Sequence, residues 1–125
     1  MDVLEAMKKS ASLVFDTAEG KASVKDYVEA CKLLVKAVME TEKEKISDLP
    51  LAENIIKTLL MDKAMMGGFY TEEKDQVSLV STLSTYFACN QLGMEDHSPV
   101  YMDNAAILRD KIEAFYQSPV AHFCS

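Results

Sequence analysis

The sequence predicts an all-α protein, a compact antiparallel bundle of four to five helices forming a single domain over residues 1–125. Apolar residues repeat at steps of three and four, which is the period of one face of a helix. Glycine and proline divide the chain into segments of helical length. No stretch shows the alternation of a strand, and no Asn-Gly or Asp-Gly pair marks a hairpin. The expected helices cover about 2–18, 23–45, 49–66, 72–92 and 99–117.

The first two segments have a clear apolar face. Gly20 follows segment 2–18 and suits the left-handed conformation that ends many helices. Ser23 is expected to cap the next helix by accepting a hydrogen bond from a backbone N–H near Asp26. The apolar stripe of segment 23–45 consists of Val24, Val28, Cys31, Val35 and Val38, widened by Tyr27, Leu34 and Met39.

Residues typical of helix N-termini precede the third and the fifth segment. Asp48 or Ser47 is expected to cap 49–66, with Pro50 in its first turn. We interpret the methionines of that segment as core filler more readily than as an adaptable binding surface: Met61, Met65 and Met66. Ser98 and Pro99 open segment 99–117, and its apolar residues step by four and three: Tyr101, Ala105, Leu108, Ile112 and Phe115.

The fourth segment contains a stretch, residues 76–94, without a single charged side chain. Its many hydroxyl and amide groups argue against a membrane span. A helix without lysine and glutamate is expected to be covered on most sides. We favour a central position in the bundle, and the alternative is partial cover by a second subunit. Its apolar stripe consists of Val77, Val80, Leu83 or Ser84, and Phe87. The candidate interface residues are Ser81, Thr85, Tyr86 and Cys89.

Composition and charge exclude several classes of partner and location. The chain has 20 acidic and 13 basic residues, a net charge of −7, which argues against binding the phosphate backbone of a nucleic acid. Three cysteines are an odd number for a disulfide framework, and the first residues lack the order of a signal peptide. We therefore expect a cytoplasmic protein with reduced thiols and no membrane association.

The sequence contains no motif typical of a catalytic, phosphate-binding or metal-binding site. There is no phosphate-binding glycine loop and no pattern of a nucleophile with its base. His97 and its acidic neighbours lack the one-turn ligand spacing of a metal site. Stretches that begin at Asp16 and Asp62 superficially resemble calcium loops but lack most of the oxygen ligands. We expect no metal and no cofactor, while the reactivity of Cys89 and Cys124 is left open.

These observations favour a non-enzymatic protein-interaction module that binds a protein partner or self-associates. The alternative is a helical bundle that binds a small molecule or cofactor in an apolar pocket lined by methionine and tyrosine. A thiol-based enzyme ranks third, because no local motif supports it.

Overall fold

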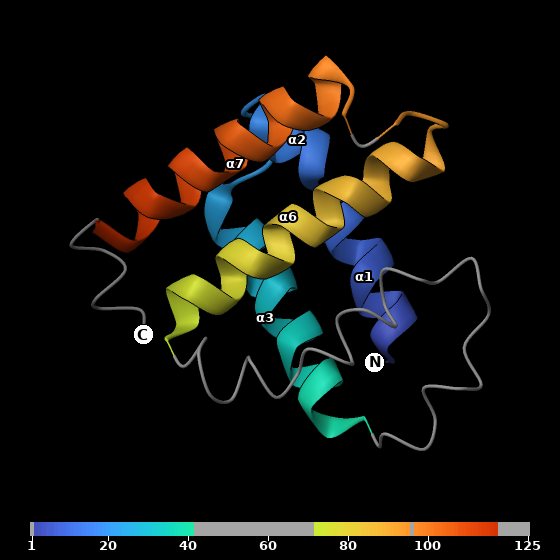
Figure 1. The fold of residues 1–125 in the computed structure, drawn as a ribbon. Coiled ribbons are helices and arrows are strands. Elements are labelled where there is room, and N and C mark those ends of the chain that lie inside the picture. Colours follow the sequence, from blue (N-terminus) through green and yellow to red (C-terminus); the bar gives the residue numbers. More distant parts are fainter. Residues whose placement is uncertain (1, 42–71, 96, 118–125) are drawn as a thin grey trace.

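The computed structural model describes residues 2–41, 72–95 and 97–117, and every regular element in these ranges is an α-helix. The predicted all-α bundle is therefore confirmed (Figure 1). Residues 42–45 of the second expected helix and the whole expected helix 49–66 lie outside the described residues. The helices are α1 (Val3–Ser12), α2 (Val14–Ala18), α3 (Val24–Glu40), α6 (Glu73–Gln91) and α7 (Pro99–Gln117).

The expected first helix is divided in two at Leu13. Asp2 caps α1, because its side chain accepts a 2.8 Å hydrogen bond from the backbone N–H of Glu5. Near the break, the Ser10 hydroxyl donates to the Met7 carbonyl and the Ser12 hydroxyl to the Lys9 carbonyl. Serine hydroxyls that bind carbonyls of the preceding turn compete with the backbone ladder. We attribute the break to these serines, and the prediction of one continuous helix was wrong.

The capping of α3 agrees with the prediction at its start and differs at its end. The Ser23 hydroxyl accepts a 3.1 Å hydrogen bond from the backbone N–H of Asp26, as expected. The helix ends at Glu40 instead of residue 45, and Thr41 has an extended backbone. The Thr41 hydroxyl donates a 2.7 Å hydrogen bond to the Ala37 carbonyl. Threonine side chains that bind the backbone in this way favour helix ends over helix interiors, which agrees with the earlier end.

Two glycines end helices in the left-handed conformation. Gly20 after α2 has φ +84° and Gly93 after α6 has φ +73°. At the end of α6, the N–H of Met94 donates to the Cys89 carbonyl at 2.9 Å, and the N–H of Gly93 donates to the Asn90 carbonyl at 3.0 Å. These two bonds form a Schellman motif, which satisfies carbonyls that the helix leaves open.

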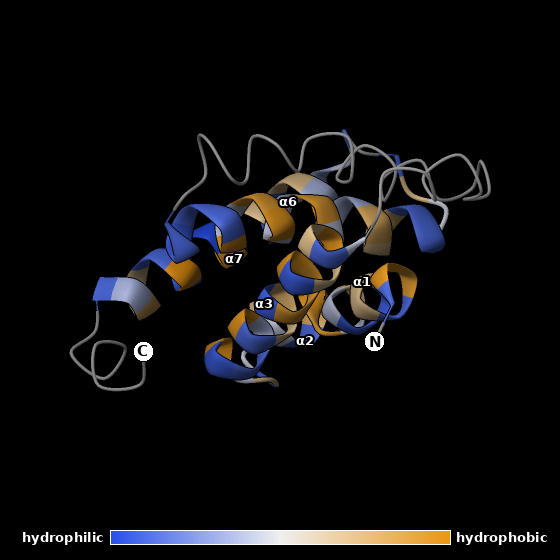
Figure 2. Cartoon of the chain, turned by 90° about the horizontal axis from the view of Figure 1, so that it is seen from below, coloured by the Kyte–Doolittle hydropathy of each residue, from blue (hydrophilic) through white to orange (hydrophobic). Residues whose placement is uncertain are grey.

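Helix α6 is the central element of the described structure. It contacts α1, α2, α3 and α7, and Figure 1 shows it crossing the middle of the molecule between α7 and the α1–α3 pair. The hydrophobic segments of α1, α3 and α6 turn toward one another in Figure 2. The largest fully buried side chains come from α1, α2, α3 and α7: Tyr27, Met7, Leu34, Leu108, Ile112, Val14, Val28 and Val38.

The apolar stripes expected from the sequence agree with the core in most positions. The sequence left Leu83 and Ser84 as alternatives on the α6 stripe. Ser84 is fully buried, whereas Leu83 is only partly buried. Met39 differs, because it is 48% exposed in the last turn of α3 and not part of the core. Of the five residues expected on the apolar stripe of α7, Leu108 and Ile112 are fully buried and the other three are partly buried.

Candidate functional site

Serine and threonine hydroxyls make it possible to bury the uncharged face of α6. The Ser81 hydroxyl donates to the Ser78 carbonyl at 2.8 Å, and the Thr85 hydroxyl donates to the Ser81 carbonyl at the same distance. The Ser84 hydroxyl donates to the Ser81 carbonyl at 3.2 Å. A buried polar group costs little when it is hydrogen-bonded. Because these hydroxyls find partners within their own helix, α6 can be packed on several sides.

The four candidate interface residues do not share one surface. Ser81, Thr85 and Cys89 are 3%, 0% and 1% exposed, so they pack inside a single chain. Tyr86 is partly buried and its ring lies edge-on to Tyr101 of α7, with 6.2 Å between ring centroids. The described structure therefore uses these residues for contacts within the chain. Self-association through this face of α6 stays a prediction.

A buried hydrogen bond joins α3 to α6. The hydroxyls of Tyr27 and Ser84 lie 2.6 Å apart, and both side chains are fully buried. Because Ser84 directs its own hydrogen to the Ser81 carbonyl, Tyr27 is the donor that best completes the network. Burial raises the pKa of the Tyr27 hydroxyl well above its usual value, so it stays protonated.

The two described cysteines are free, buried thiols. Burial raises the pKa of Cys31 to about 12, with a smaller opposing effect from its hydrogen bond to Tyr27. Burial also raises the pKa of Cys89. The nucleophilic form of a cysteine is the thiolate, so neither side chain is activated in this arrangement. Cys124 lies outside the described residues.

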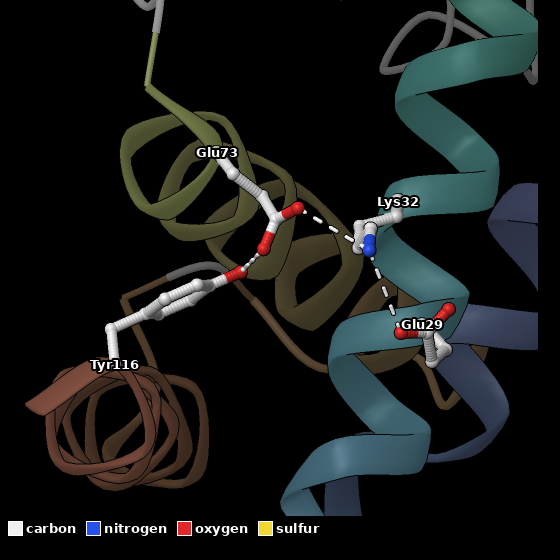
Figure 3. Close-up of polar contacts among 4 residues, drawn as sticks. All are labelled: Glu29, Lys32, Glu73 and Tyr116. Carbon is white, nitrogen blue, oxygen red and sulfur yellow. Dashed lines mark hydrogen bonds and ion pairs between the residues drawn. The ribbon is translucent and has the colours of Figure 1, made fainter. Parts of the chain in front are cut away.

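A polar cluster connects α3, α6 and α7 at the beginning of α6 (Figure 3). The Glu73 carboxylate accepts a 2.6 Å hydrogen bond from the Tyr116 hydroxyl and lies 3.3 Å from the Lys32 ammonium group. Lys32 also lies 3.5 Å from Glu29, one turn earlier on α3. A separate ion pair, Lys74 with Glu113 at 2.9 Å, joins α6 to α7 nearby.

Two carboxylates, Glu29 and Glu73, share the single ammonium group of Lys32 in this cluster. Partial burial lowers the pKa of Lys32, but the neighbouring carboxylates, above all Glu73, outweigh it and the pKa is raised. Burial and the hydrogen bond to Glu73 raise the pKa of Tyr116. Lys32 and Tyr116 therefore hold their protons at neutral pH, and the cluster links α3, α6 and α7. A cavity of about 280 Å³ adjoins it, lined by Lys32, Val35, Lys36, Glu73, Gln76 and Val77.

An apolar groove lies between α1, α2 and the end of α6, with a volume of about 320 Å³. The residues that line this α1–α2–α6 groove are Lys8, Ala11, Ser12, Phe15, Phe87, Ala88, Gln91 and Leu92. Ala11, Phe87 and Ala88 are its most buried members. Lys8, Ser12, Gln91 and Leu92 are exposed, and Leu92 retains 59% of its surface.

The groove was not foreseen from the sequence. The sequence pattern predicts an apolar face on the first helix and on the fourth, but nothing in the pattern brings these two faces together. The expected pocket lined by methionine and tyrosine does not match it, because its aromatic residues are Phe15 and Phe87. Among the described residues, Met7 and Tyr27 are in the core instead. Met61, Met65 and Met66 lie outside the described ranges.

Within residues 2–41, 72–95 and 97–117, no three histidine, cysteine or acidic side chains gather closely enough to hold a metal ion. No helix within these ranges combines the length and the apolar content needed to cross a bilayer.

No protein-family model, curated protein or solved structure matches the chain.

Proposed function

We propose that the protein is a non-enzymatic protein-interaction module that binds an apolar segment of a partner protein in the α1–α2–α6 groove. The observation that carries the proposal is the groove itself, with an aromatic and alanine interior and polar residues along its edge. Protein interfaces combine an apolar centre of this kind with a polar rim. An aromatic or aliphatic side chain of the partner would fill the groove as an anchor.

The charge at the groove defines the partner further. Lys8 is its single charged lining residue, and no described residue forms an ion pair with it. In a chain with a net charge of −7, an unpaired lysine at an apolar groove favours a ligand with a carboxylate. The proposed partner segment therefore carries an acidic residue next to its apolar anchor.

A small-molecule ligand is the second candidate function, favoured by the groove volume of about 320 Å³. Small-molecule sites usually bury most of the ligand surface. Here one side is open, because Lys8, Ser12, Gln91 and Leu92 are exposed. This openness favours a protein segment over a small molecule. The proposal keeps the expected cytoplasmic location, supported by the free thiols of Cys31 and Cys89.

The test uses a library of random peptides selected on the full chain. We expect enriched peptides to carry an aromatic or aliphatic residue beside an acidic one. Leu92→Glu should weaken their binding roughly tenfold or more, as measured by fluorescence anisotropy. Met102→Glu is the matched control, because Met102 is 57% exposed on α7 and does not line the groove.

Several outcomes contradict this proposal. Equal losses in the Leu92 and Met102 variants would place binding elsewhere, and so would no loss in either. Decanoate that binds the wild-type protein and not the Leu92→Glu variant, without any enriched peptide, would support the small-molecule function instead.

A further inference from the structure

The outer face of α7 carries an apolar repeat that no described helix covers. Val100, Ile107 and Ala114 are seven residues apart, with Asp103 and Asp110 between them at steps of three and four. Such spacing places all five residues along one side of a helix. All five are exposed, and the opposite side of α7 contributes the buried residues of the core. We call these five residues the α7 outer face.

Within the described ranges, neither carboxylate of the α7 outer face is paired with a cation. The residues three and four positions from Asp103 are all apolar, and those around Asp110 are alanine, isoleucine and a further acid. No described residue forms an ion pair with either aspartate. Lys111 does not compensate them either, because its ammonium group donates to the Thr17 carbonyl of α2 at 3.0 Å.

The charges of Asp103 and Asp110 favour a basic helix of another protein over a second copy of this chain as the binding partner of the face. If a second copy of the chain packed on this face, Asp103 and Asp110 of one copy would meet the same acids of the other. Like charges in a helix–helix seam disfavour pairing. A helix with apolar residues at the same spacing and lysine or arginine beside them would complement both the apolar positions and the carboxylates.

We propose that the α7 outer face binds a basic amphipathic helix of a partner protein. The apolar residues of that helix pack against Val100, Ile107 and Ala114, and its cations pair with Asp103 and Asp110. From Val100 to Ala114 the face is about 21 Å long, which sets the length of the contact. This surface is separate from the α1–α2–α6 groove, so the inference does not depend on the function proposed for that groove.

The test uses two designed helical peptides of three heptads. One carries leucine at the first and lysine at the fourth position of each heptad, and the other has glutamate in place of lysine. We expect the lysine peptide to bind the full chain roughly tenfold or more tightly than the glutamate peptide. Backbone NMR shifts caused by the lysine peptide should centre on residues 100–114.

Variants of the full chain separate specific docking from general charge attraction. Ile107→Glu should weaken binding of the lysine peptide, whereas Met102→Glu, on another side of the same helix, should not. The double variant Asp103→Lys/Asp110→Lys should reverse the preference and bind the glutamate peptide. Circular dichroism of each variant checks that the helices are retained.

Other results would overturn the inference. Equal affinity for both peptides, or binding that is unchanged in Ile107→Glu, would show that this face is not the docking surface. A wild-type dimer that sedimentation detects and Ile107→Glu abolishes would assign the face to a second copy. Peptides selected for the α1–α2–α6 groove should bind Ile107→Glu normally, so the two proposals fail separately.

Discussion

The hydroxyl of Tyr27 is shielded from water and makes a short hydrogen bond to Ser84. The ring is fully buried on α3, and the 2.6 Å distance between the hydroxyls links it to α6. A phenol in an apolar interior needs such a partner, because an unpaired hydroxyl costs free energy. The position of this pair therefore helps to fix the register of α3 on α6.

Tyr27→Phe tests this pair directly. Removing the hydroxyl leaves Ser84 with its bond to the Ser81 carbonyl only. We expect the free energy of unfolding to fall by about 1–2 kcal/mol in urea denaturation. The double variant Tyr27→Phe/Ser84→Ala should lose less than the sum of the two single variants, because the pair is removed together. Strict additivity would show that the two hydroxyls do not interact.

At the scale of helices, local signals decide where most of them begin and end. The Ser98 hydroxyl accepts a 3.2 Å hydrogen bond from the Tyr101 N–H at the start of α7, just as Ser23 does at the start of α3. Gly93 ends α6 with a positive φ and open space around its α-carbon. Such termini depend only on residues that are close in the sequence, so they can be predicted from the sequence alone.

Gly93→Ala tests the conformational part of this helix end. Nothing lies within 4 Å of the added methyl group, so no clash contributes. The left-handed backbone alone should lower the free energy of unfolding by about 1 kcal/mol. Gly93→Asn should lose less, because asparagine tolerates this conformation. If Gly93→Ala unfolded at the same urea concentration as the wild-type protein, the helix end would not need glycine.

The break at Leu13 and the polar cluster around Glu73 depend on packing between helices, not on neighbouring residues in the sequence alone. Serine hydroxyls can extend or interrupt a helix, and the choice depends on what packs beside them. The contacts of Glu73 with Lys32 and Tyr116 join residues far apart in the chain. Periodicity identifies the apolar face of each helix but not which faces meet. For that reason the core stripes could be predicted, whereas the α1–α2–α6 groove and this cluster could not.

For the molecule as a whole, buried ionisable groups set an alkaline limit to stability. The folded pKa of Cys31 is about 12, above the ordinary value of 9.0. Its contribution is complete below pH 9 and is lost as pH rises toward the folded pKa, because the unfolded thiol ionises first. Tyr27 adds to this loss above its ordinary pKa of 10.0.

Urea denaturation between pH 9 and 10 reports mainly on the cysteines, because the unfolded tyrosines ionise chiefly above pH 10. Over this interval Cys31 alone should lower the free energy of unfolding by about 1 kcal/mol, because its unfolded thiol passes from half ionised to mostly ionised. Cys31→Ala should reduce this slope, whatever its stability at neutral pH. An unchanged slope in that variant would show that Cys31 does not hold its proton in the folded state.

The central position of α6 also affects how the chain folds during synthesis. Helices α1 and α3 contact each other, but both also pack on α6, which is complete only at Gln91. At about 5–20 residues per second, the ribosome needs roughly 3–10 s to make the chain from residue 41 to residue 91. Through that interval no later helix of the described structure covers the α6-binding faces of α1 and α3. Apolar surface that is exposed in this way favours aggregation, so we expect the nascent chain to be most prone to it before α6 is complete.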